Sequence, residues 1–277
     1  AAEKLFITQS ALNQQLLKLE KELGTPLFHR SRTNWRLTEA GEIYIEGAKA
    51  ALQIKNTTYN RIYDVVSARK GHLTIGLTPG RGLRMFTAIY PELHRSFPNL
   101  DVRPIEMRVR AQQDAIAKGE IDVGLMTLAR RDQTSDTYYP LKQEELVLII
   151  PAGHPLAAKA APSGKPLATL DLTELRYEPF VLMDKTSTLR SSCDLLFEKA
   201  GFAPNILFET NNTSGIAAMV QSTLCCGIIP RYYTLGLTEG VACFSLPERP
   251  SWEIVISCQK NGYLNSGARE FIRLARE

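Results

Sequence analysis

The amino-acid sequence predicts an α/β protein in three parts: a short helical module, one long helix, and a larger region in which strands and helices alternate. Three observations lead to this prediction. Leucines recur with helical spacing in residues 9–23, residues 38–70 contain no proline, and strand-like runs alternate with helical patterns from residue 72 onward. A chain of 277 residues is long enough for about two domains.

The composition is that of a soluble globular protein, with 44% hydrophobic and 22% charged residues. No apolar run approaches the roughly 18 residues of a membrane span, and no basic-then-apolar leader opens the chain. The five cysteines are odd in number and lack CxxC spacing, which favours neither a zinc site nor a disulfide framework. We therefore expect a cytoplasmic protein without membrane segment, metal or cofactor.

The positive charge is concentrated at one end of the sequence. Residues 1–71 carry 11 Lys/Arg and 7 Asp/Glu, whereas residues 72–277 carry 22 of each. A basic module beside a neutral one indicates that only the first part contacts a polyanion, although an excess of this size can also arise by chance.

Residues 9–23 have the pattern of an amphipathic helix. Leu12, Leu16, Leu19 and Leu23 form one stripe, Thr8 is a candidate N-cap, and Gly24 is a candidate stop. The opposite face is polar. It carries Gln9, Ser10, Asn13, Gln14, Lys18 and Lys21. Amides can pair with adenine and lysines with phosphates, so this face could contact DNA; the alternative is a solvated surface.

The flanking residues favour the DNA interpretation. Upstream, residues 1–7 have the pattern of the end of another helix. Downstream, residues 26–30 and 35–37 flank a turn-like segment, which predicts a small hairpin whose apolar residues face inward and which carries three arginines, Arg30, Arg32 and Arg36. A helix, a turn, a second helix and a basic hairpin together predict a winged helix-turn-helix that binds DNA.

The run AAEKLFITQSALNQQLLKLEKELGTPLFHRSRTNWRLTEAG resembles the signature of the LysR-type transcriptional regulators almost from end to end. The resemblance implies that the 9–23 helix enters the major groove of double-stranded operator DNA. Gln9, Ser10, Asn13 and Gln14 then match base-reading positions, with the three arginines in the wing and turn region. Asn13 departs from the usual Ser. The DNA-binding domain is expected at 1–37, with the first helix of the family's pattern missing.

Residues 38–71 are predicted to form a linker helix capped by Thr38 and running to about Lys70. Its apolar seam comprises Ala40, Tyr44, Ala51, Ile54, Ile62 and Val65. A helix of about 30 residues spans roughly 45 Å, and an apolar seam of that length needs a partner helix. The resemblance implies that it pairs two chains, so we expect a dimer that assembles further into a tetramer. RNA polymerase is a further candidate partner. The alternative is packing within one chain.

From residue 72, strand-like runs alternate with helical patterns, which predicts parallel sheets. The expected strands are 73–77, 100–105, 121–126, 146–150, 180–183, 206–209, 241–246 and 252–258. The expected helices are 84–96, 110–118, 187–200, 213–225 and 265–276. In such sheets ligands bind beyond the carboxyl ends of strands, near helix N-termini.

Four loops meet this rule, and all are rich in hydrogen-bonding groups; helix capping is the alternative role for each. The candidate ligand-binding residues are Thr78, Gly80, Arg81, Thr127, Thr186, Thr188 and Thr213. Arg81 lies between two glycines, where its guanidinium could bind an anion bidentately. A small organic carboxylate is therefore the expected effector.

Further motifs, residues 119–125 (GEIDVGL), 154–157 (HPLA) and 227–230 (GIIP), resemble landmarks of the LysR-type effector domain. The resemblance implies a two-lobed, periplasmic-binding-protein-like domain at 72–277. Lobe I would comprise about 72–148 and 256–277, and lobe II about 149–255, with the effector between them.

Two alternatives remain at this stage. One is a redox-responsive regulator of the same family, because of Cys193, Cys225 and Cys258; Cys225 and Cys226, however, are expected to pack in a core. The other is a solute-binding protein, which would not explain residues 1–37. An enzyme is not expected, because the four histidines have neither metal spacing nor an evident nucleophile partner, and no GxGxxG or Walker sequence is present.

Overall fold

The computed structural model describes residues 2–3, 6–30, 34–66, 69–162, 164–222, 224–237 and 239–277. The chain forms two compact units, one ending at Tyr59 and the other beginning at Asn60. The boundary lies inside helix α2 (Glu39–Val65), whose last turns therefore belong to the second unit.

In the first unit, α1 (Gln9–Leu23) follows a hydrogen-bonded N-cap, in which the Thr8 hydroxyl accepts from Ala11 N at 3.1 Å. Gly24 ends the helix with a positive φ of 72°, a conformation that glycine adopts without strain. Both predicted ends are confirmed. The apolar stripe is shorter than predicted, because Leu12, Leu16 and Leu19 are half-buried but Leu23 is exposed.

The predicted hairpin is also present. β1 (Phe28–His29) and β2 (Arg36–Leu37) pair antiparallel, with Phe28 opposite Leu37. The hairpin packs closely on the start of α2: a Cβ at Gly41 would lie 2.0 Å from the Leu27 carbonyl oxygen. Only glycine permits this approach of helix and wing.

The Thr38 hydroxyl accepts from Gly41 N at 3.0 Å, so Thr38 caps α2 as predicted. The helix has 27 residues, about 40 Å of length, and it ends at Val65 rather than near Lys70. Lys70 instead begins a strand. The chain must leave the helix before that point to pair with the next strand of the sheet.

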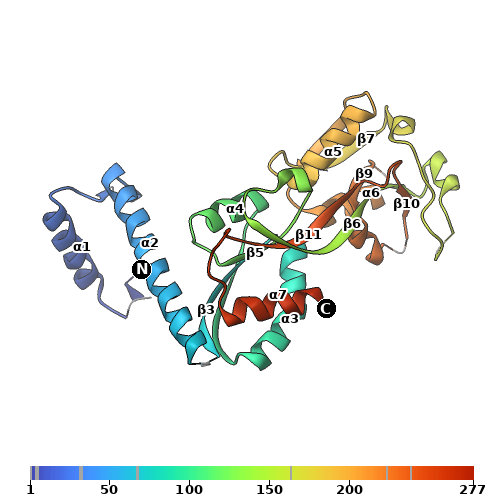
Figure 1. Ribbon diagram of the computed structural model, residues 1–277. Coiled ribbons are helices and arrows are strands. Elements are labelled where there is room, and N and C mark those ends of the chain that lie inside the picture. Colours follow the sequence, from blue (N-terminus) through green and yellow to red (C-terminus); the bar gives the residue numbers. More distant parts are fainter. Residues whose placement is uncertain are drawn as a thin grey trace. The chain divides into compact units, whose positions relative to one another are not determined.

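The second unit contains two α/β lobes (Figure 1). In lobe I, strand β3 (Lys70–Leu77) pairs in parallel with β4 (Asn99–Glu106) and with β5 (Val123–Leu128). Its helices are α3 (Arg81–Ser96), α4 (Val109–Ala117) and α7 (Ser266–Arg276). Leu73, Ile75, Leu77 and Phe271 are buried in its core.

Lobe II contains β7 (Pro179–Met183) paired in parallel with β8 (Asn205–Thr210), and the short strands β9 (Gly227–Pro230) and β10 (Val241–Ser245). Its helices are α5 (Thr188–Lys199) and α6 (Thr213–Gln221). Phe180, Phe197 and Phe244 are buried in its core.

Two strands connect the lobes. β6 (Thr137–Pro151) pairs with β11 (Ser251–Cys258) up to Glu145, and from Leu146 onward with β9 and β10. β11 also pairs with β5 and so lies in the lobe I sheet. Figure 1 shows β6 and β11 running together between the lobes. The second expected lobe boundary, after residue 255, therefore falls inside a lobe I strand.

The predicted fold class is confirmed, with one correction. The two connecting strands β6 and β11 and the lobe II strands β9 and β10 pair antiparallel, so the sheets are mixed rather than wholly parallel. Residues 137–145 were not predicted as strand, because polar side chains dominate that half of β6. No helix of the described chain is both long enough and apolar enough to cross a membrane.

Candidate DNA-binding surface and ligand pocket

The candidate base-reading side chains lie on one exposed face of α1. Gln9, Ser10, Asn13, Gln14 and Lys18 are all exposed, whereas the leucine side of the helix is half-buried. Their positions repeat with helical spacing, so their amides, hydroxyl and ammonium point to the same side. These five side chains are thus exposed together on one face of the described helix.

The three wing arginines differ in their surroundings. Arg36 is exposed on β2. Arg30 pairs instead with the buried carboxylate of Glu20, which also accepts from Leu27 N at 2.8 Å. The Arg30 guanidinium also lies 5.5 Å from the centre of the Trp35 ring. Arg30 thus ties the wing to α1, a structural role that was not predicted. Arg32 lies outside the described residues.

A cavity of about 410 Å³ opens between the two lobes of the second unit. It is lined by Thr78, Pro79, Gly80, Arg81, Arg108, Val109, Thr127, Met183, Thr186, Ser187, Thr188, Leu189, Asn211, Asn212, Thr213, Ser214, Tyr233 and Trp252. We call it the interlobe pocket. A volume of this size suits a small organic molecule.

Four helices begin at the interlobe pocket. α3 and α4 come from lobe I, and α5 and α6 come from lobe II. The Ser187 and Asn212 side chains cap the two lobe II helices, whereas neither lobe I helix has a side-chain cap. Helix N-termini favour negative charge, so the four ends together make the pocket attractive to an anion.

The Arg81 side chain is held within the protein. Its Nη2 donates to Glu144 Oε1 at 3.3 Å, and its guanidinium carbon lies 3.6 Å from the centre of the Tyr232 ring. Glu144 is buried and also accepts from Trp252 Nε1 at 3.1 Å. The predicted bidentate contact of Arg81 with an anion therefore competes with an existing buried ion pair. Arg81 is only 14% exposed, which rules out a freely solvated side chain.

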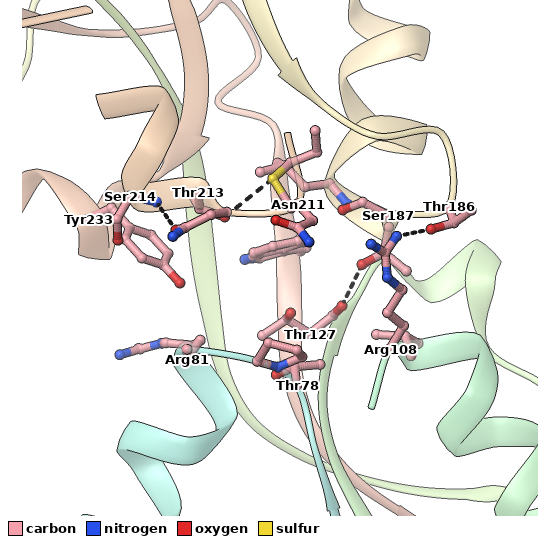
Figure 2. Close-up of a pocket in the computed structure, with 18 residues that line it drawn as sticks. Thr78, Arg81, Arg108, Thr127, Thr186, Ser187, Asn211, Thr213, Ser214 and Tyr233 are labelled. Carbon is pink, nitrogen blue, oxygen red and sulfur yellow. Dashed lines mark hydrogen bonds between the residues drawn. The ribbon is translucent and has the colours of Figure 1, made fainter. Parts of the chain in front are cut away.

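Arg108 lies on the other side of the pocket. In Figure 2 its side chain points toward Thr186, while Arg81 extends away from that loop near Tyr233. Arg108 Nη1 donates to Asp184 Oδ1 at 2.5 Å and contacts the Thr186 hydroxyl. Arg108 belongs to lobe I and Asp184 to lobe II, so this ion pair joins the lobes.

Several threonine hydroxyls also take part in internal hydrogen bonds. The Thr188 hydroxyl donates to the Thr127 carbonyl at 2.9 Å, a second polar contact between the lobes. The Thr213 hydroxyl lies 3.7 Å from the Met183 sulfur. Burial raises the pKa of the nearby Tyr233 hydroxyl despite the opposing effects of Arg81 and Thr213, so Tyr233 is a neutral hydrogen-bonding group.

The structure brings all seven sequence-predicted ligand residues into this one pocket. Of the lining residues that were not predicted, Arg108 follows a strand and precedes a helix. The strand-to-helix rule that nominated the other loops could therefore have found it. Tyr233 and Trp252 had no comparable signal, because tertiary packing alone brings them to the pocket.

The cysteines show no reactive environment. All five are free, and Cys193, Cys225, Cys226 and Cys258 are buried. Burial raises the pKa of both Cys193 and Cys226 to about 12, so these side chains remain thiols. Because the thiolate is the reactive form, this gives no support to redox sensing. The expected core position of Cys225 and Cys226 is confirmed.

A helix with an exposed polar face and a hairpin wing, followed by a long helix and a two-lobed domain with a pocket, is typical of a DNA-binding regulator with a sensor. Comparison with models of known protein families supports this class of protein. The model described as "LysR substrate binding domain" matches residues 67–277, and that described as "Bacterial regulatory helix-turn-helix protein, lysR family" matches residues 1–42. The chain belongs to the LysR family and is a transcriptional regulator with an effector-binding domain.

Its relatives include the uncharacterized transcriptional regulator YcgK of Bacillus subtilis, 28% identical over all of this chain and 88% of that protein. The Hca operon transcriptional activator HcaR of Escherichia coli is 27% identical over 100% of this chain and 91% of its own length. Among solved structures, a full-length OxyR variant from Pseudomonas aeruginosa has a TM-score of 0.68 at 21% identity, covering 99% of this chain and 90% of that one. The effector-binding domain of QuiR, solved with shikimate, has a TM-score of 0.62 at 18% identity, covering 74% and 95%.

Proposed function

We propose that this regulator responds to a small organic acid bound in the interlobe pocket. The observation that carries the proposal is the convergence of four helix N-termini on a pocket whose only charged lining residues, within the described chain, are Arg81 and Arg108. Hydroxyl and amide groups of Thr78, Thr127 and Asn211 can accept and donate to the rest of the ligand.

The apolar part of the lining supports a compact ligand body. Val109, Met183, Leu189, Tyr233 and Trp252 provide carbon and aromatic surface beside the polar groups. An acid with a small ring or a short aliphatic body would place its carboxylate near the helix N-termini and its carbon atoms against the apolar lining. QuiR, which shares the fold, was solved with shikimate, so shikimate belongs in any set of trial ligands.

The DNA side of the proposal rests on the exposed face of α1 and on Arg36. The protein would bind double-stranded operator DNA in the cytoplasm, with Gln9, Ser10, Asn13 and Gln14 reading bases and Lys18 and Arg36 contacting phosphates. Two chains would pair through α2 and assemble further into a tetramer. RNA polymerase would be the partner through which the bound regulator changes transcription.

Calorimetry of the full chain against a set of aromatic and aliphatic carboxylic acids tests the ligand proposal. We expect at least one acid to bind, and Thr188→Ala and Arg81→Ala to weaken it by about tenfold or more. Thr87→Ala and Arg95→Ala are matched controls, because both residues are exposed on α3 and neither lines the pocket. If both pocket variants bind the acid as tightly as the controls, the acid does not bind in this pocket.

A further inference from the structure

The two arginines of the interlobe pocket differ in how easily each can leave its present partner. Arg81 and Glu144 have side chains only 14% and 6% exposed, and Tyr232 lies against the guanidinium. Moving Arg81 away would leave the Glu144 carboxylate buried without its cation, which is costly. Arg81 is thus fixed in place by its surroundings.

The ion pair of Arg108 with Asp184 is much more open to water. The Arg108 side chain is 43% exposed and that of Asp184 is 26% exposed. Ion pairs at this exposure contribute little net stability, because water solvates both charges well when they separate. Arg108 can therefore change partners at low cost.

Asp184 does not depend on Arg108 for its hydrogen bonds. Its Oδ1 also accepts from Thr186 N at 3.0 Å and from the Thr186 hydroxyl at 2.6 Å. The Asp184 backbone is likewise held, because its N–H donates to the Thr210 carbonyl at 2.8 Å. If Arg108 turns away, Asp184 Oδ1 keeps both hydrogen bonds from Thr186, whereas the buried Oδ2 has no hydrogen-bond partner among the described residues.

Arg108 is also well placed to receive an anion. It is the N-cap residue of α4, which no side chain caps, and it lines the pocket directly. The guanidinium already binds one carboxylate, that of Asp184. The geometry for a carboxylate at this guanidinium is thus present before any ligand arrives.

We infer that Arg108 is the residue that selects acids in this pocket, and that Asp184 is an internal competitor which the ligand's carboxylate displaces. This inference rests on the proposed function of the pocket. The exchange breaks an ion pair between lobe I and lobe II and forms a new one between lobe I and the ligand. Ligand binding would therefore change the contacts that hold the lobes together on this side, while Arg81 continues to position Tyr232 and Glu144.

Benzoate and its neutral analogue benzamide are suitable probes, because they differ in charge but scarcely in shape. Binding of each is measured by calorimetry on the full chain, for wild type, Arg108→Gln, Asp184→Asn and the double variant. Arg110→Gln is the matched control: Arg110 lies on the same helix, is exposed and does not line the pocket. Thermal unfolding of each variant shows whether it is folded.

We expect Arg108→Gln to weaken benzoate binding by about tenfold or more, and Asp184→Asn to strengthen it severalfold. Benzamide binding and the Arg110→Gln control should change little. Because Asp184 acts through Arg108, the gain from Asp184→Asn should vanish in the double variant. Because the Arg108–Asp184 ion pair is exposed to water, we expect the single substitutions to shift Tm by no more than a few degrees.

Three results would overturn the inference. Undiminished benzoate binding by Arg108→Gln would exclude a contact between Arg108 and the ligand's carboxylate and would leave the proposed function standing. A gain from Asp184→Asn that persists in the double variant, or no gain at all, would exclude the exchange. Failure of benzoate and of every other carboxylic acid to bind the wild type would overturn the inference together with the acid-sensing function.

Discussion

Arg36 and Arg30 lie in the same hairpin but have different partners. Arg30 is held by Glu20 and Trp35, whereas Arg36 is exposed and available to a phosphate. We expect Arg36→Ala to weaken binding to all DNA sequences about equally and to reduce the slope of log K against log salt by roughly one. Titrations of the full-length protein at several salt concentrations measure this slope. An unchanged slope would exclude Arg36 from the phosphate contacts.

Gln9, unlike Arg36, is expected to contact a base rather than a phosphate. Its exposed amide starts the polar face of α1, where it can pair with a base edge. We expect Gln9→Ala to cost about 1–3 kcal/mol on an operator selected from random DNA by this protein, and much less on unselected DNA. Equal losses on both DNAs would show that Gln9 positions the helix rather than reading sequence.

At the scale of elements, the last turns of α2 are joined firmly to lobe I. The Asp64 carboxylate accepts from Tyr263 Oη at 2.5 Å, from Ser266 N at 3.0 Å and from Arg269 Nη2 at 3.1 Å, and so holds the N-terminus of α7. The Asn60 amide pairs with both the N–H and the carbonyl of His72, each at 3.0 Å. These contacts explain why the unit boundary lies within a continuous helix.

We expect Asp64→Asn to lower the free energy of unfolding of the second unit by about 1–3 kcal/mol at pH 7. Although burial opposes it, hydrogen bonds from Ser266 and Tyr263 keep the Asp64 pKa below its ordinary value of 3.8. A lowered pKa in the folded state contributes stability above the unfolded-state pKa, and this stability is lost as the pH falls through the folded value.

Urea unfolding of wild type and variant at several pH values measures this effect. The difference between the two should be full at neutral pH and should shrink below about pH 3.8. Glu92→Gln is the control, since Glu92 lies in an exposed ion pair with Arg95. A difference that does not depend on pH would mean that Asp64 contributes by packing rather than by its charge.

For the whole molecule, the apolar seam of α2 has no covering partner among the described residues of this chain. Ile54 is 69% exposed, Ile62 50% and Val65 84%. We expect the full chain to be at least a dimer at micromolar concentration, because a seam of this length favours a second helix. Sedimentation without DNA measures this, and Ile54→Glu should shift the equilibrium toward the monomer. Lys55→Gln, one residue away and off the seam, should not; a wild-type monomer would contradict the expectation.

Of the predicted helices and strands, the longest and most periodic ones agree best with the bounds in the structure. Residues 9–23 and the five helices of the second unit were predicted within a few residues, because their apolar spacing and caps are local properties of the chain. The first half of β6 was missed, because its strand character depends on pairing with β11, which is distant in sequence.

The candidate sites also have features that the local sequence predicts and features that it does not. The loops of the interlobe pocket follow from local rules, since loops between a strand and a helix lie at the carboxyl edge of the sheet in each lobe. The roles of the arginines do not follow from local rules. Arg30, Arg81 and Arg108 each meet a carboxylate that the sequence does not place beside them: Glu20, Glu144 and Asp184.

The sequence by itself determined the class of protein, the order of its parts and seven of the residues that line the pocket, because periodicity, capping and the family signature are local. Only the tertiary structure decided which arginine is locked in a buried ion pair and which can exchange partners. That distinction depends on burial, since removing water strengthens a charge pair and raises the cost of leaving one member unpaired. Burial is set by residues far apart in the chain, and no local pattern contains it.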